Sequence, residues 1–195
     1  MSPAATSTKD RLLKAAFEEF SKRGFAGARV DEIASRAGAN KALIYQYYGD
    51  KEALFKHVLE IKMHEMGRIS TDDPARFPEV VGEFFDFHAA NPWVTRLTLW
   101  EALDFGGKPV PNEAERKKHL ASHVANLEEF QRQGVVDPSL DARQTLVTLI
   151  GMVQIWFSLP QVARMVAGGN PYTPEALKQR RAHLVEVAKK MLEVR

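Results

Sequence analysis

The sequence has 195 residues, of which 45% are hydrophobic and 27% are charged, proportions that are typical of a globular protein. Cysteine is absent, which excludes disulfides and thiolate chemistry, and no long uncharged apolar run predicts a membrane-spanning helix. Residues 1–9 are small and polar without an apolar core, unlike a signal peptide, so we expect a cytoplasmic protein that does not contact a membrane.

The net charge of +2 is unevenly distributed along the chain. Residues 1–56 hold ten Lys or Arg against seven Asp or Glu, which gives +3 for this segment and −1 for the remainder. A basic segment is what phosphate binding requires. An ordinary solvated surface explains so small an excess equally well, so charge alone does not indicate DNA binding.

Apolar residues recur with a period near 3.6 along almost the whole chain, which predicts an all-α fold of about nine helices. The first helix begins near Ser7, whose spacing to Asp10 is that of a capping box, and Gly24 is expected to end it. Two very short helices follow. Gly38 ends the first of them, and Asn40 can cap the second.

The remaining helices are longer and are separated by proline, glycine and polar residues. A polar connection over 70–78 and a glycine- and proline-rich loop over 106–111 divide this part of the chain. We expect a fourth helix from Asp50 to about Ile69 and a break at Asn91-Pro92 between the fifth and sixth helices. A charged seventh helix is expected from about Asn112 to Gln133. An apolar eighth helix follows, which Pro160 ends or kinks, and a last helix runs from Pro174 to the end.

The two short helices meet at a tight turn over residues 37–40. Because short helices are unstable alone, they must pack on the first helix and on the start of the fourth. This is helix-turn-helix geometry, in which the second short helix enters the major groove of DNA. Spacing alone gives equal weight to an ordinary helical hairpin with exposed polar side chains.

The solvent face of the second short helix has side chains suited to DNA. Lys41 suits a phosphate, and Tyr45 can donate its hydroxyl to one. Gln46 can pair with adenine through two hydrogen bonds, and Ala42 can contact a thymine methyl group. These four residues are the predicted base-reading set.

The segment RVDEIASRAGANKALIYQYYGDKEALF, residues 29–55, resembles the N-terminal signature of the TetR family of transcriptional regulators, and LLKAAFEEFSKRGF, residues 12–25, resembles the family's first helix. The matching residues are Val30, Ile33, Ala34, Ala37, Gly38, Lys41, Tyr45, Tyr47, Lys51, Glu52, Leu54 and Phe55. The resemblance implies a helix-turn-helix DNA-binding domain over 1–50 and a helical ligand-binding and dimerisation domain over 51–195. It also implies a regulator, most often a repressor, that binds a palindromic operator as a homodimer.

Carried over by position, the resemblance places Lys41, Ala42, Tyr45 and Gln46 at the groove, with Asn40 at the start of that helix, and Tyr47 and Lys51 on the phosphate backbone. The sequence departs from the family pattern at two positions. Arg29 replaces the usual Thr or Ser and cannot cap the second helix, but it could reach a phosphate or the minor groove. Leu43 replaces a frequent Thr and removes one expected phosphate contact.

Apolar stripes on the last two predicted helices suit a two-fold dimer, which a repressor of this type needs because operator half-sites lie about one or more turns of DNA apart. Burial in the monomer's own core explains the stripes as well, and the resemblance favours dimerisation. The predicted dimer residues are Leu146, Leu149, Ile150, Val153, Leu177, Leu184 and Ala188.

Large side chains in the fifth, sixth and eighth helices favour a pocket for a small apolar or aromatic effector. The predicted contacts are His88, Trp100, Met152 and Trp156, although most such residues are core. A ligand that fits only the conformation with misplaced recognition helices would release the DNA.

Two other classes of protein are weighed against a regulator. For an enzyme, no phosphate loop, nucleophile elbow or Cys–His pair is present, and no cofactor is expected. Glu115, His119 and His123 share a helical face and could hold a metal, but their surroundings are charged and favour a solvated face. A helical protein-interaction module would keep the apolar stripes without needing the cluster of DNA-binding side chains.

Overall fold

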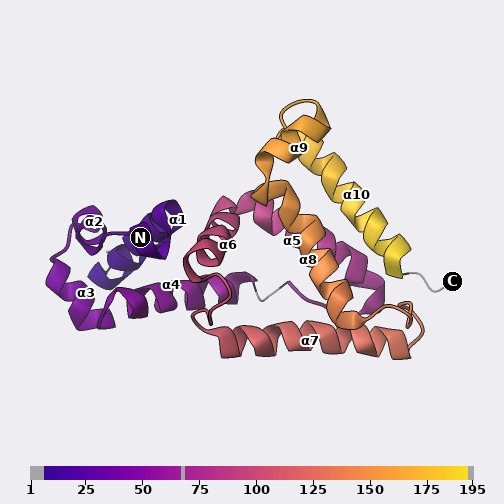
Figure 1. The fold of residues 1–195 in the computed structure, drawn as a ribbon, viewed down its shortest axis with the longest axis horizontal. Helices are drawn as coiled ribbons and strands as arrows, with labels where there is room; N and C mark the ends of the chain where they lie inside the picture. Colours follow the sequence, from indigo (N-terminus) through magenta and orange to yellow (C-terminus); the bar gives the residue numbers. More distant parts are fainter. Residues whose placement is uncertain (1–6, 67–68, 193–195) are drawn as a thin grey trace, which may run out of the picture. The chain divides into compact units, whose positions relative to one another are not determined.

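The computed structural model describes the backbone of residues 7–66 and 69–192. This part of the chain contains ten α-helices and one 3₁₀ helix, which confirms the all-α prediction (Figure 1). The contacts divide the chain into two compact units. The N-terminal unit comprises Met1–Glu65 and Arg96–Glu113, and the C-terminal unit comprises Met66–Thr95 and Ala114–Arg195.

Four helices form most of the N-terminal unit, and three of them, α1, α3 and α4, start directly after the predicted capping residues. They are α1 (Thr8–Gly27), α2 (Val30–Arg36), α3 (Lys41–Tyr48) and α4 (Lys51–Met66). The Ser7–Asp10 capping box is present at α1. Asp50 Oδ1 accepts the N–H of Ala53 at 2.7 Å in the first turn of α4. The predicted extension of this helix to about Ile69 lies partly outside the described residues.

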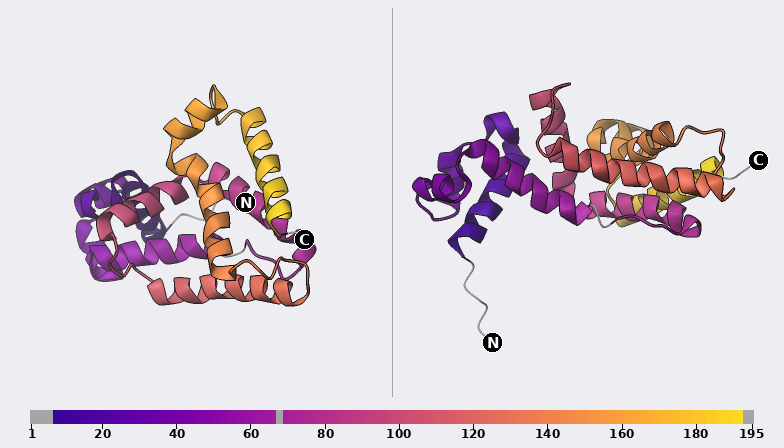
Figure 2. Two further views of the ribbon diagram at one scale, coloured as in Figure 1. Left: turned by 45° about the vertical axis from the view of Figure 1, so that its right-hand side comes forward. Right: turned by 90° about the horizontal axis from the view of Figure 1, so that it is seen from below.

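The two short helices depend on the longer ones for their apolar contacts. Ile33 of α2 and Ile44 of α3 are both completely buried, as are Leu12 and Phe20 of α1. Phe20 meets Phe55 of α4 edge-on, with 4.8 Å between ring centroids. Figure 2 shows α1, α2 and α3, in indigo and purple, grouped together in both further views. The shared core fixes which face of α3 is left exposed.

The end of α1 is held by the second half of α6 (Pro92–Phe105). Gly24 has φ 71° and ψ −177°, so α1 kinks there and adds one more turn before it ends. The Trp100 ring packs so closely on this glycine that a Cβ would lie 2.8 Å from it. The Asp104 carboxylate accepts the N–H groups of Phe25 at 2.9 Å and of Ala26 at 3.1 Å.

The C-terminal unit is built around α5, with α8 and α10 packed against it. Its core also takes side chains from α7, among them the fully buried Leu127. Its helices are η1 (Pro74–Arg76), α5 (Phe77–Ala90), α7 (Glu113–Arg132, of which Glu113 belongs to the other unit), α8 (Ala142–Ser158), α9 (Pro160–Ala167) and α10 (Pro174–Leu192). The sequence did not predict α9 as a separate helix. Pro160 starts it at an angle of 85° to α8.

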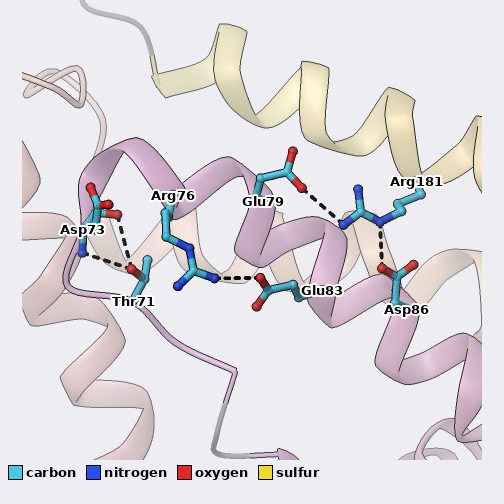
Figure 3. A network of polar contacts seen from close by, with 7 residues as sticks. All are labelled: Thr71, Asp73, Arg76, Glu79, Glu83, Asp86 and Arg181. Carbon is cyan, nitrogen blue, oxygen red and sulfur yellow. Dashed lines mark hydrogen bonds and ion pairs between the residues drawn. The ribbon is translucent and has the colours of Figure 1, made fainter.

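Glycine and ion pairs bring α10 onto α5. A Cβ on Gly82 of α5 would lie 2.8 Å from the Arg181 guanidinium carbon and 2.9 Å from Val185 Cγ2, so a larger residue would displace these two side chains of α10. Arg181 donates to Asp86 at 2.7 Å and to Glu79 at 3.2 Å, as Figure 3 shows. The hydrogen bond and charge of Asp86, with smaller contributions from Glu79, raise the pKa of Arg181, although burial acts in the opposite direction. Arg76, the last residue of η1, donates to Glu83 of α5 at 2.8 Å.

The predicted dimer residues require a correction, because most of them belong to the single chain's interior. Leu149, Val153, Leu184 and Ala188 are buried in the core of the C-terminal unit, where α8 and α10 face α5 and each other. Leu177 is partly buried against the same core. The apolar stripes are therefore mainly core, which is the alternative that the sequence left open.

None of the described helices is by itself long and apolar enough to cross a membrane. The bent pair Ala142–Ser158 and Pro160–Ala167 would be long and apolar enough only if the two helices were counted together.

Candidate DNA interface and ligand cavity

The exposed face of α3 presents the predicted base-reading side chains. Lys41, Ala42, Tyr45 and Gln46 are all exposed, with 46% of Tyr45 accessible. Positions i, i+1, i+4 and i+5 share one side of a helix, and the buried Ile44 turns the opposite side inward. The arrangement offers a hydroxyl, an amide and an ammonium group on one convex surface, as reading a major groove requires.

Lys41 is held by a carboxylate of α2 in the free chain. Its Nζ lies 2.8 Å from Asp31 Oδ1, and both side chains are exposed. The hydrogen bond between them raises the pKa of Lys41 and lowers the pKa of Asp31, so both remain charged near neutral pH. A phosphate that binds Lys41 must therefore compete with Asp31.

The other predicted DNA contacts occupy different settings. Tyr47 is 42% exposed, and the Arg29 side chain is exposed and makes no capping hydrogen bond to α2. Asn40 has a structural role, because its Oδ1 accepts the Ala42 N–H at 2.8 Å. The sequence predicted this cap, and the hydrogen bond uses the only oxygen of the side chain.

Lys51 is turned toward the end of α1. Its Nζ donates to the Ala26 carbonyl at 3.3 Å and lies 4.9 Å from the Phe25 ring centroid. Partial burial lowers the pKa of Lys51. The side chain fastens α4 to the kinked end of α1 in the free chain.

Sequence reasoning missed Glu19, a completely buried carboxylate that joins α1 to α2. Its Oε1 lies 3.2 Å from Arg23 Nε and its Oε2 lies 3.6 Å from Arg36, while the Arg29 backbone N–H donates to Oε1 at 3.4 Å. The available signal was its position beside Phe20 on the apolar face of the first helix. Glu19 thus helps to set the angle of α2, and through α2 the position of α3.

A cavity of about 290 Å³ lies within the C-terminal unit, between α5, α7 and α8. Its wall is mostly aliphatic and aromatic, with three polar side chains. The lining residues are Ile69, Phe77, Val80, Val81, Phe84, His119, Leu120, His123, Leu146, Leu149, Ile150 and Gln154. Small-molecule sites are commonly apolar clefts of this kind with a few polar groups.

His119 and His123 place their ring edges together in the cavity wall. Their Nε2 atoms are 3.1 Å apart, so one nitrogen donates a hydrogen bond and the other accepts it. Burial, with a smaller contribution from His119, lowers the pKa of His123. Glu115 does not complete a metal site with them, because the described residues include no group of three or more His, Cys, Asp or Glu able to hold a metal ion.

The four predicted ligand contacts do not line this cavity. His88 is buried behind Phe84, with Nδ1 donating to the Phe84 carbonyl at 3.0 Å, and burial lowers its pKa. Trp100 belongs to the N-terminal unit and packs on Gly24. Met152 and Trp156 pack against the core, and Arg180 of α10 donates to the Met152 carbonyl at 2.9 Å and lies over the Trp156 ring.

A second apolar row of α8 is exposed to solvent. Val147 is 66% accessible, Ile155 is also exposed, and Gly151 lies between them at four-residue spacing. A Cβ on Gly151 would meet no atom within 4 Å. The patch continues onto α9, and its exposed apolar members there and at the bend are Leu159, Val162, Met165 and Val166. We call these residues, with Val147, Gly151 and Ile155, the α8–α9 face.

Two short helices at a tight turn, with an exposed polar face on the second, define a helix-turn-helix DNA-binding protein. The family comparisons agree with this class over both parts of the chain. Residues 12–58 match the family described as bacterial regulatory proteins of the tetR family, and residues 77–190 match the tetracyclin repressor-like C-terminal domain. The chain belongs to the TetR family of transcriptional regulators.

Individual relatives cover nearly the whole chain. The HTH-type transcriptional repressor SCO4008 of Streptomyces coelicolor is 39% identical over 172 residues, which is 88% of this chain and 90% of that protein. The crystal structure of the transcriptional regulator SCO4942 from the same organism has a TM-score of 0.81 and 33% identity, covering 95% of this chain and 98% of the other. FadR of Bacillus subtilis in complex with stearoyl-CoA shares the fold at 18% identity, with a TM-score of 0.69 over 94% and 98% of the two chains.

Proposed function

We propose that the chain is a repressor that binds a palindromic operator as a homodimer and releases it when a small, largely apolar effector fills the cavity. The observation that carries the proposal is the exposed face of α3, where Tyr45 and Gln46 project from a helix whose other side is fixed by the buried Ile44. The name of the S. coelicolor repressor supports repression rather than activation.

DNA binding is tested by fluorescence anisotropy with fragments flanking the protein's own gene, over a series of salt concentrations. Tyr45→Ala and Gln46→Ala should each weaken a specific fragment, and Gln46→Ala should cost roughly 1–3 kcal/mol of discrimination at one base pair. Gln179→Ala, an exposed glutamine of α10 outside the α8–α9 face, is the control and should change nothing. Weak, sequence-independent binding that neither variant alters would favour a protein-interaction module instead.

We assign the dimer contact to the α8–α9 face. Large exposed apolar patches commonly mark association sites, and the exposed Gly151 would allow a partner helix to approach closely. Ile155→Glu should convert the dimer to a monomer in sedimentation at micromolar concentration and abolish tight operator binding. Val135→Glu changes an exposed valine outside this face and should leave the dimer intact. A wild-type chain that sediments as a monomer would refute the assignment.

The effector role of the cavity is tested by filling it. Ile150 lies in the wall, so Ile150→Phe should occupy the space and abolish the response to any compound that releases wild-type protein from DNA. Val135→Phe adds the same ring to a turn after α7, outside the cavity, and should leave the response unchanged. If release persists in Ile150→Phe, the effector binds elsewhere.

A further inference from the structure

Three helices line the cavity, and none of its described lining residues is acidic. From α5 come Phe77, Val80, Val81 and Phe84, and from α8 come Leu146, Leu149, Ile150 and Gln154. A cationic ligand would therefore enter a low-dielectric site with no carboxylate to neutralise it, which is costly.

The carboxylates of α5 are engaged elsewhere. Glu79 and Asp86 bind Arg181 of α10, and Glu83 binds Arg76 (Figure 3). These acids alternate along α5 with Val80, Val81 and Phe84, which face the cavity. The three acids are paired with arginines and are absent from the cavity lining, so α5 contributes no negative charge to it.

His119 and His123 are the only titratable side chains among the lining residues contributed by α5, α7 and α8. In the uncharged pair, one Nε2–H donates to the other Nε2 across 3.1 Å, and the donor ring keeps a free Nδ1. A proton from solvent can add to that Nδ1 without breaking the hydrogen bond. A second proton would set two N–H groups against each other, so the pair accepts one positive charge.

On the basis of the proposed effector role of this cavity, we infer that its ligand is an apolar molecule with one acidic group, whose anion binds as the histidine pair takes up one proton. The apolar wall receives the body of the molecule, and the singly protonated pair neutralises its head. Below neutral pH the pair is more readily charged, so the anion binds more tightly as pH falls. Burial lowers the pKa of His123, which disfavours a positive charge on this ring in the empty cavity.

A matched series of probes tests the inference by isothermal titration calorimetry of the full chain: octanoate, octan-1-ol and octylammonium, which share one chain length and differ in head charge. At about pH 6, octanoate should bind roughly tenfold or more tightly than the other two, and it should weaken by up to roughly tenfold per unit as pH rises toward about 8. Buffers of different ionisation enthalpy should report uptake of about one proton per ligand for octanoate alone.

His119→Gln and His123→Gln should each remove the preference for octanoate and its pH dependence, while octan-1-ol binding stays unchanged. His183→Gln removes an exposed histidine of α10 and should behave as wild type. Circular dichroism checks each variant for folding, and either variant alone suffices if the other does not fold.

The outcomes separate the inference from the function beneath it. If no probe binds, or if Ile150→Phe leaves binding intact, both the effector role of the cavity and its acidic ligand are overturned. If octan-1-ol or octylammonium binds wild type as tightly as octanoate at both pH values, and Ile150→Phe abolishes that binding, the cavity retains its role and only the acidic ligand is overturned.

Discussion

In the N-terminal unit, each short helix fully buries only one or two side chains, whereas in the C-terminal unit α8 buries one apolar row and exposes another. Ile44 is the only fully buried residue of α3; Leu43 and Tyr48 are half-buried, and the other residues of the helix are exposed. On α8, Val153 is 0% accessible and Val147 is 66% accessible. On α3, one buried residue is enough to predict which face is exposed. On α8, the sequence contains two apolar rows and does not show which of them is exposed.

The difference matters for the proposed function, in which the two units perform different tasks. Base reading requires side chains held at a fixed angle, and the N-terminal unit provides this with Glu19, the Gly24 kink and the Asp104 cap. Ligand binding and dimerisation require apolar surface, one part enclosed and one part exposed. The C-terminal unit provides both around a single helix, α8.

Gly24→Ala tests the rigidity of the N-terminal unit and should have the largest effect. Its φ of 71° with ψ of −177° is nearly restricted to glycine, and the new Cβ would meet Trp100 at 2.8 Å. Strain and overpacking together should lower the free energy of unfolding by about 3 kcal/mol. Urea denaturation followed by circular dichroism measures this loss.

Gly27→Ala is the control in the same helix, because its nearest Cβ contact would be Arg23 Cβ at 3.4 Å and its φ is not positive. It should change stability by no more than about 1 kcal/mol. Equal losses in the two variants would mean that Trp100 and the kink do not hold the end of α1.

Val153→Ala and Val147→Ala test the two apolar rows of α8 with the same substitution. Removing two buried methyl groups at Val153 should cost about 2 kcal/mol of unfolding free energy. The exposed Val147 should cost less than about 0.5 kcal/mol when measured on the monomeric Ile155→Glu background. A comparable cost at both positions in the monomer would show that the exposed row is part of the monomer core.

The same contrast explains what the sequence could predict. The helix starts at Ser7, Asn40 and Asp50 follow from local capping chemistry, and each of those caps is present. The exposed set on α3 follows from one buried residue within a known motif. The division of the α8 stripe into core, cavity wall and exposed row depends on where α5, α7 and α10 pack, which helical periodicity does not contain.

Trp100 and Glu19 also have roles that local sequence patterns do not predict. The sequence favoured Trp100 as a ligand contact because it is large and apolar, but its ring covers a glycine that is 76 positions earlier in the chain. Glu19 was unremarked because a glutamate in a helix is usually solvated. Both roles arise from contacts between distant segments, and local propensity does not encode such contacts.

Asp104→Ala should have an intermediate effect, confined to the end of α1. The substitution removes the acceptor for the N–H groups of Phe25 and Ala26, of which the first is partly buried. Loss of a charged acceptor from a part-buried donor costs roughly 1–2 kcal/mol. Hydrogen exchange at these two amides should accelerate by about tenfold, and Asp104→Asn, which keeps one oxygen acceptor, should restore part of the protection. Unchanged hydrogen exchange in Asp104→Ala would show that Asp104 does not stabilise the end of α1.

Asp31→Asn should have the smallest effect and acts on binding rather than stability. The substitution replaces the charged partner of Lys41 Nζ, 2.8 Å away, with a neutral oxygen acceptor that holds the ammonium group less tightly, and it removes one negative charge from the edge of the DNA-binding face. Operator affinity at low salt should rise by roughly threefold to tenfold, and the slope of log affinity against log salt should steepen by about one. Glu32→Gln, which neutralises the adjacent exposed acid of α2, is the control for net charge alone and should raise affinity less. If Asp31→Asn instead weakens the operator complex, Asp31 orients Lys41 for its phosphate, and the exposed ion pair helps to position the DNA-binding face of α3.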